Sequence, residues 1–120
     1  MYSIPEWGQS ISKAGTLEVF KAGKIIEVIQ IPAGSISFSF GRLIENDVTF
    51  DHESVSRHHA ILQFGPRNSA YIFDLGSTHG SFMNKKQLPQ CQFIKVTSGN
   101  DILQFGGSSR LFVLNLAEED

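Results

Sequence analysis

Glycine and proline divide this chain of 120 residues into short pieces. The eleven glycines and four prolines recur along its whole length, at positions 5, 8, 15, 23, 32, 34, 41, 65, 66, 76, 80, 89, 99, 106 and 107. The longest stretch without either residue is 42–64, and most other intervals are shorter than an average helix. Ten phenylalanines, with many isoleucines and valines, favour strands in pieces of this length.

Apolar residues recur with the period of two that is typical of strands. The clearest case is 35–40, where Ile36, Phe38 and Phe40 share one face and serines the other. Strands are predicted at 17–20, 24–31, 35–40, 47–50, 60–64, 70–75, 82–84, 93–96, 102–105 and 111–116. About ten short strands at intervals of roughly ten residues predict an all-β fold, a β-sandwich.

A helix over 52–64 is the one competing interpretation. Asp51 could cap it, and Val55, His59 and Leu62 fall at helical spacing. The turn signal of residues 65–68, Gly-Pro-Arg-Asn, directly afterwards favours a strand and a hairpin instead.

The chain has the length of one domain. Residues 1–15 are expected to form an N-terminal extension, 16–116 the domain, and 117–120 an acidic tail. Trp7 in the extension is expected either to pack on the domain or to be free.

Composition narrows the classes of partner. Ten basic against twelve acidic residues give a net charge of −2, so a nucleic acid is not the expected partner. No apolar run approaches a membrane span, and the first residues lack the pattern of a signal peptide. Cys91 is the only cysteine, which excludes a disulfide scaffold. We therefore expect an intracellular protein with no membrane contact.

Three loops are rich in hydrogen-bonding residues: 41–42, 54–59 and 76–80. The loops at one end of a sandwich are held rigidly by its strands, so these three could converge. Such a site would hold the Arg42 guanidinium with the hydroxyls of Ser56, Ser77 and Thr78, and no carboxylate need lie in it. Donors without a basic acceptor suit an anion, and this set suits a phosphate monoester.

Two chemical alternatives are weaker. A zinc site would need histidines 52, 58, 59 and 79, but 58 and 59 point to opposite faces of a strand and no cysteine completes a tetrahedron. A hydrolase would need Ser56 or Ser77 with His59 and Asp74, but the sequence has no nucleophile elbow. We expect no enzyme activity, no metal and no cofactor.

The same loops carry a family resemblance. Gly41-Arg42, then Ser56-Arg57-His58-His59 (family form S-x-x-H), then residues 77–84, Ser-Thr-His-Gly-Ser-Phe-Met-Asn (family form S-T-N-G-T-x-x-N), together resemble the forkhead-associated (FHA) domain, from about Leu17 to Leu116. More narrowly, residues 4–7, 17–19 and 77–80 resemble the subgroup that includes the nuclear inhibitor of protein phosphatase-1 and kanadaptin.

The resemblance implies a sandwich of about eleven mostly antiparallel strands that binds phosphothreonine peptides on the loops at one end. Carried over by motif, the phosphate-binding residues are Arg42, Ser56 and Thr78. The peptide-binding residues are Arg57, His79, Ser54 and Ser77, and the structural motif comprises Gly41, His59, Gly80 and Asn84. His79 departs from the family, which has asparagine there, so the contact with the peptide backbone either passes to a ring nitrogen or is lost.

The resemblance thus predicts a non-catalytic module that recruits a phosphothreonine-containing protein, with no small-molecule substrate. It is expected to be monomeric, and nuclear on the narrower resemblance. A phosphorylation-independent interaction or oligomerisation domain is the alternative from another class. A nucleic-acid role is a weaker one, in which Arg42, Arg57 and the histidines would contact backbone phosphates.

Overall fold

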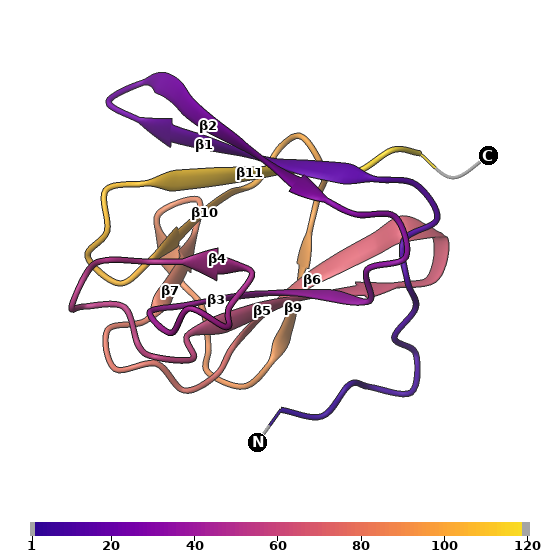
Figure 1. Cartoon of the computed structure of the whole chain (residues 1–120). Coiled ribbons are helices and arrows are strands. Elements are labelled where there is room, and N and C mark those ends of the chain that lie inside the picture. The colour runs from indigo at the N-terminus through magenta and orange to yellow at the C-terminus, as the bar shows by residue number, and fades with distance from the viewer. Residues whose placement is uncertain (1, 119–120) are drawn as a thin grey trace.

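Two antiparallel sheets pack face to face in the computed structural model, which describes residues 2–118 (Figure 1). The eleven strands are β1 (Gly15–Lys21), β2 (Lys24–Ile31), β3 (Ser37–Gly41), β4 (Val48–Thr49), β5 (Ala60–Gly65), β6 (Ser69–Asp74), β7 (Ser81–Met83), β8 (Lys86–Gln87), β9 (Phe93–Val96), β10 (Ile102–Phe105) and β11 (Leu111–Asn115). One short 3₁₀ turn, Pro66–Asn68, joins β5 to β6. The predicted all-β sandwich of about eleven strands is confirmed.

The strand order explains how distant parts of the sequence come together. One sheet has the order β2-β1-β11-β10-β7-β8 and the other β4-β3-β5-β6-β9. All pairings between neighbouring strands are antiparallel except β3 with β4, which is parallel. Consequently the connections β3–β4, β4–β5 and β6–β7 lie at one end of the sandwich, on the left in Figure 1, and the β5–β6 hairpin lies at the other end.

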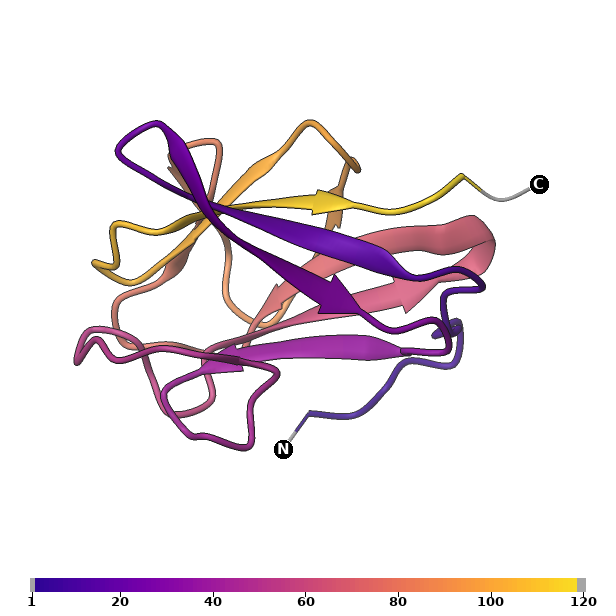
Figure 2. The same ribbon diagram turned by 45° about the horizontal axis from the view of Figure 1, so that its top comes forward.

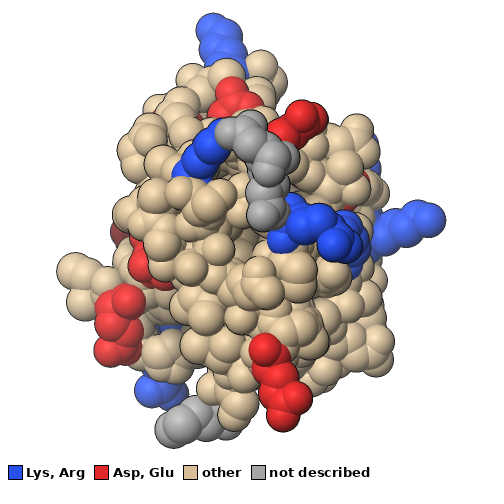
Figure 3. All heavy atoms as spheres, turned by 90° about the vertical axis from the view of Figure 1, so that its right-hand side faces the viewer, with Lys and Arg blue, Asp and Glu red and all other residues tan. Residues whose placement is uncertain are grey.

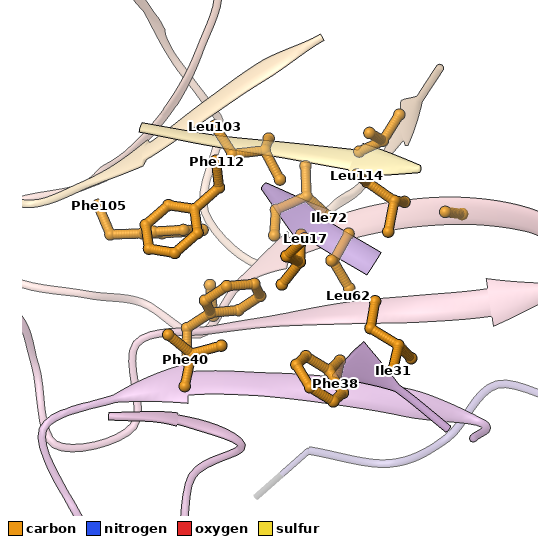
Figure 4. Packing of buried hydrophobic residues seen from close by; sticks show 14 of the residues in the cluster. Leu17, Ile31, Phe38, Phe40, Leu62, Ile72, Leu103, Phe105, Phe112 and Leu114 are labelled. Atoms are coloured by element: carbon orange, nitrogen blue, oxygen red, sulfur yellow. The ribbon is translucent and has the colours of Figure 1, made fainter. Parts of the chain in front are cut away.

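The core lies between the sheets and follows the alternation seen in the sequence. Burial alternates along β1, β6 and β11, and Leu17 and Leu114 meet from one sheet while Leu62 and Ile72 come from the other (Figure 4). Phe40 stacks on Phe105 with ring centroids 4.5 Å apart, towards the end that carries the three loops. Apolar burial of this kind is the main source of stability, and here it fixes the strands from which the loops arise.

Residues 52–64 are not helical. Residues 51–59 form a loop, and β5 pairs with both β3 and β6, so Ala60, Leu62 and Phe64 point into the core with a period of two. Val55, fully buried, packs into the core from the loop itself. Its helical spacing from His59 and Leu62 is therefore a coincidence of loop packing.

Two strands differ from the sequence pattern. β2 alternates in sequence, yet Ile25, Ile26 and Val28 are about half exposed because β2 is an edge strand. The second differing strand is β8, a short strand at Lys86–Gln87 that the sequence pattern did not predict. Asn84 and Lys85 both have positive φ, which closes the two-residue hairpin between β7 and β8.

The N-terminal segment packs on the domain. We call residues 2–12 the N-terminal strap, and it runs beside the sheet of β3 and β5 in both ribbon views (Figures 1 and 2). Trp7 lies edge-on to Tyr71, with centroids 4.7 Å apart, so of the two expectations for Trp7 the packed one holds. Ile11 is buried in the core. Of the predicted acidic tail, Glu118 is exposed, and residues 119 and 120 lie outside the described residues.

The surface at the end opposite the three loops is mostly uncharged. In Figure 3 the largest group of Lys and Arg lies on the right of this end, other Lys and Arg lie at the top and at the lower left, and Asp and Glu are scattered. Within residues 2–118, no helix is long and apolar enough to cross a membrane.

Candidate functional site

The three polar loops converge at one end of the sandwich. Arg42 in the β3–β4 loop donates its backbone N–H to the Ser56 carbonyl at 3.1 Å. Ser56, in the β4–β5 loop, accepts a hydrogen bond from the Thr78 N–H on its hydroxyl oxygen at 3.2 Å. The β6–β7 loop that carries Thr78 is thus joined to the other two through one serine. The convergence that the sequence suggested is present.

Arg42 is exposed, and only part of its guanidinium is used within the fold. Its Nε donates to the Val55 carbonyl at 2.5 Å, which fixes the plane of the group. Within residues 2–118 its two terminal nitrogens have no hydrogen-bond or ion-pair partner. They carry four N–H donors in a fixed fork, the geometry that binds a carboxylate or phosphate through two parallel bonds.

The hydroxyls of Ser56 and Thr78 are also available as donors. Ser56 is half-buried and its oxygen accepts from Thr78, but its own hydrogen has no acceptor within the described residues. Thr78 is exposed, and its hydroxyl has no partner there either. The structure therefore brings Arg42, Ser56 and Thr78 to the same end of the sandwich, each with a side-chain hydrogen-bond donor that has no partner within residues 2–118.

His59 lies fully buried beneath these loops and joins two of them. Its Nδ1 accepts from the Ser56 N–H at 3.0 Å, and its Nε2 is 2.9 Å from the Gly80 carbonyl. A carbonyl only accepts, so the proton is on Nε2 and the ring is neutral. Burial lowers the pKa of His59 below its ordinary value of 6.5, although the Gly80 carbonyl and Asp74 act in the opposite direction.

Asp74, at the end of β6, organises the β6–β7 loop from below. Burial raises its pKa, but hydrogen bonds from the hydroxyls of Ser77 and Ser81 and from the N–H groups of Ser77 and Gly76 outweigh burial, so the pKa lies below its ordinary value. The hydroxyls lie 2.7 and 2.6 Å from Oδ1. Ser77 is buried by this network and also accepts from the Gly80 N–H. Its side chain thus faces Asp74, away from Arg42 and Thr78.

Two glycines permit the close approach of the loops. A Cβ on Gly41 would collide with the carbonyl of Arg57 and lie 2.7 Å from the Asn46 amide nitrogen. Gly80 has φ of +87°, which side chains disfavour, and a Cβ there would meet Gln87 at 2.7 Å. The buried Asn46 donates to the carbonyls of Leu43 and Arg57, each at 2.9 Å, and so closes the first loop on the second.

The predicted peptide-binding residues surround this centre unevenly. Arg57 and His79 are exposed, and their side chains have no hydrogen-bond partner within residues 2–118. Ser54 instead bonds His52 Nδ1 at 2.7 Å and accepts from the Gly107 N–H at 2.7 Å. It therefore links the second loop to the β10–β11 turn, which brings a fourth loop to this end.

Asn84 lies in the β7–β8 turn, outside the three loops. Its side chain donates to Asp101 at 2.9 Å and accepts from the Ile102 N–H at 2.9 Å. It thus ties the turn to the start of β10, as a brace for the hairpin that follows the third loop.

Sequence reasoning missed Asn46 and the supporting role of Asp74. A buried asparagine in a polar loop is not distinguishable from a surface one by sequence, since both are surrounded by loop residues. Asp74 had a usable signal, because an aspartate followed three residues later by serine is typical of a side chain that caps its own turn. Within residues 2–118 no three histidine, cysteine or acidic side chains are placed to share a metal ion.

Comparison with known proteins agrees with the fold and the loops. The sequence model of the FHA domain family matches residues 38–106. Human kanadaptin is 40% identical over 99% of the chain, and the human nuclear inhibitor of protein phosphatase 1 is 32% identical over 95%. Yeast Pml1p has the same fold, with a TM-score of 0.83 at 17% identity, covering 98% of this chain and 100% of Pml1p.

The two relatives are much longer than the match. The chain spans 17% of kanadaptin and 32% of the phosphatase inhibitor. The chain in the Pml1p structure, in contrast, is matched over 100% of its length, and that match takes in 98% of this chain. With more than half of its residues matched to the family and both sheets in place, the chain belongs to the forkhead-associated domain family.

Proposed function

We propose that this chain is a phosphothreonine-dependent protein-binding module, with Arg42, Ser56 and Thr78 as its phosphate pocket. The FHA family is a known phosphopeptide-binding module. The observation that carries the proposal is the hydrogen bond from the Thr78 N–H to the Ser56 hydroxyl oxygen. It joins the loop of Thr78 to the hydroxyl of Ser56, while the Val55 carbonyl holds the Arg42 guanidinium with its terminal nitrogens unoccupied.

The donor set matches the charge of a phosphate monoester. At neutral pH a phosphothreonine side chain carries nearly two negative charges and three acceptor oxygens. The Arg42 fork supplies the positive charge and two parallel hydrogen bonds, and the hydroxyls supply two more. Asp74 lies below the loop and is fully occupied, so it does not oppose the anion directly.

Arg57 and His79 fit a role along the peptide on either side of the phosphate. Both are exposed and free to turn towards a bound chain. The ring nitrogens of His79 can take part in hydrogen bonds with N–H or carbonyl groups, which is the chemistry that a peptide backbone requires. Ser77 fits the supporting network better than a direct contact, because its hydroxyl bonds Asp74 and Gly80.

The preference for phosphothreonine over phosphoserine would come from an apolar niche for the threonine methyl, as the family implies. Burying one methyl contributes on the order of 1 kcal/mol, which is a several-fold preference. The module would have no catalytic step of its own, because both ring nitrogens of His59 are engaged with backbone groups. A nuclear location is part of the proposal, and the name of one relative, the nuclear inhibitor of protein phosphatase 1, supports it.

Titration calorimetry with Arg42→Ala tests the proposal. A phosphothreonine peptide selected from a degenerate library should bind the wild type with a Kd in the micromolar range, about −7 to −9 kcal/mol. Losing the fork should cost about 2–4 kcal/mol, or at least roughly thirtyfold in Kd. Arg67→Asn is the matched control, since it removes the same charge at the opposite end and asparagine tolerates the φ of 56° there. Binding by Arg42→Ala within threefold of wild type would show that the pocket is misassigned.

A further inference from the structure

An apolar groove lies on the outer face of the β3-β5-β6-β9 sheet, beside the candidate site. Its volume is about 930 Å³, and residues from the strap, the strands and the loops line it. Its floor is a row of cross-strand neighbours, Ile61 on β5, Phe73 on β6 and Phe93 on β9. All three are partly exposed. The outer face of an antiparallel sheet is usually polar, so an apolar row of this kind marks a contact surface.

The groove begins where the phosphate-binding loops end. Asn46, from the β3–β4 loop, and His58, from the β4–β5 loop, form its wall on that side. Leu75, the first residue after β6 in the β6–β7 loop, lies in the same wall. Each of the three loops that hold the candidate phosphate pocket thus contributes a residue to the groove. A chain anchored by its phosphate and leaving the pocket on this side would lie directly over the floor.

The strap shows which side chains the face accepts. Tyr2 lies edge-on to Phe73 and Phe93, with centroids 5.2 and 6.3 Å apart, and forms the opposite wall. Trp7 covers the next part of the same face against Tyr71 and Phe93. An extended segment of the chain itself therefore already places two aromatic rings against this sheet, and the groove is the stretch left uncovered between Tyr2 and the loops.

Charge is confined to the lip of the groove. The His58 ring lies 3.9 Å from Glu45, and both side chains are mostly exposed. The floor carries no ionisable group. An apolar or aromatic side chain is favoured there over a charged one, because a buried charge without a partner is costly.

We propose that this groove binds an apolar side chain of the same phosphorylated partner, at least three residues away from its phosphothreonine. This inference rests on the proposed phosphate pocket. Ile61 lies two residues beyond His59, which is about 6.6 Å along the strand, and His59 itself lies buried beneath the loops, so a partner chain must extend more than two residues from the phosphate to reach the floor. The groove would add sequence selectivity to the phosphate anchor and to the contacts proposed for Arg57 and His79.

A phosphothreonine library with six degenerate positions on each side tests the groove. It is to be screened on wild type, on Ile61→Asp, and on Ile102→Asp as a matched control, since Ile102 is a partly exposed strand residue of the other sheet. Wild type and control should select an aliphatic or aromatic residue three or more positions from the phosphothreonine, and Ile61→Asp should not. Long selected peptides should bind Ile61→Asp about tenfold more weakly, whereas peptides cut to two residues on each side should be unaffected.

Alkylation of Cys91 gives a second readout that needs no change in the core. Cys91 is exposed, lies at the groove and is the only cysteine in the chain. The long peptide should slow its reaction with N-ethylmaleimide, and the short peptide should not.

Three results would overturn the inference. One is equal apolar selection by wild type and Ile61→Asp, and another is equal reactivity of Cys91 with both peptides. The third is a dimer in sedimentation that Ile61→Asp dissolves, because a second copy would then occupy the groove. Failure of the phosphate pocket itself is a separate result, in which no phosphorylated peptide binds wild type better than its unphosphorylated form.

Discussion

Replacing His59 by alanine should destabilise the domain strongly, because the ring joins two loops from a fully buried position. Its removal leaves the Ser56 N–H without an acceptor, while the Gly80 carbonyl keeps only the Gly106 N–H as a donor. The orphaned N–H costs about 1–3 kcal/mol, the lost bond to the Gly80 carbonyl adds about 1 kcal/mol, and the lost edge contact with Phe105 adds a cavity. We expect a loss of about 3–5 kcal/mol, and hence a fall in Tm of roughly 10–20 °C.

His59→Asn and His59→Gln separate the two bonds. An asparagine amide oxygen can take the place of Nδ1 and accept from Ser56, and a glutamine amide nitrogen can reach the Gly80 carbonyl in place of Nε2. Each should recover part of the stability that alanine loses. Phosphopeptide affinity should also fall in His59→Ala, since Ser56 and Gly80 lose their common support.

The pH dependence gives the same prediction an independent test. The pKa of His59 is lowered in the folded chain, so below about pH 6.5 the unfolded chain takes up a proton that the folded chain does not. Wild type should therefore lose stability as pH falls from about 6.5 to 5, by at most about 1.4 kcal/mol per pH unit. His59→Asn should lack this slope.

Asp74, whose pKa is also lowered, adds a loss of stability in the same direction only below about pH 4. Thermal unfolding at pH 7.5, 6.0 and 5.0 measures the effect of His59 apart from that of Asp74. An alanine variant that melts within about 3 °C of wild type and keeps its pH slope would refute the reasoning.

Three further predictions follow from the site and the strap. Phosphopeptide binding should weaken below about pH 6, because the second pKa of the phosphate lies there and the dianion is lost. Titration calorimetry at pH 5.5 and 7.5 checks this. Tighter binding at pH 5.5 that disappears in His79→Asn would instead show that a charged His79 contacts the phosphate. Gly41→Ala should lower the free energy of unfolding by about 1–3 kcal/mol and weaken phosphopeptide binding, because the added methyl meets the Arg57 carbonyl. Urea unfolding and the same titration measure the two losses, and an unchanged affinity would contradict the close packing of the loops. Trp7→Ala should lower the free energy of unfolding by about 2–3 kcal/mol, because its contacts with Tyr71 and Phe93 are lost, but the affinity for short phosphopeptides should not change. A parallel loss of affinity would mean that the strap supports the loops.

Most of the fold could be predicted because its strands bury one face and expose the other. Phe38 and Phe40 alternate with serines and are buried as the period of two requires. The pattern failed where tertiary position overrides it. Ile25 and Ile26 of β2 are exposed because no strand lies beyond them, and the sequence of a strand does not say that it is at an edge.

The loops that form the site could be predicted from the sequence, but most of the hydrogen bonds that hold these loops in place could not. Gly41, Ser56 and Thr78 form a recognisable pattern because the contacts between the loops need those residue types at those places. Asn46 bridges two carbonyls that are far apart in the sequence, and no local pattern marks such a bridge. For the same reason the sequence did not show that Ser77 faces inwards or that Ser54 reaches the β10–β11 turn.

The most direct test of phosphothreonine recognition is a titration of the wild-type chain with three peptides that differ at one residue. A peptide selected from the library is synthesised with phosphothreonine, phosphoserine or unmodified threonine at the same position. We predict micromolar binding of the phosphothreonine form, several-fold weaker binding of the phosphoserine form, and no measurable binding of the threonine form. Equal affinity for the phosphothreonine and threonine peptides would contradict the account, because the donors around Arg42 would then have no anion to bind.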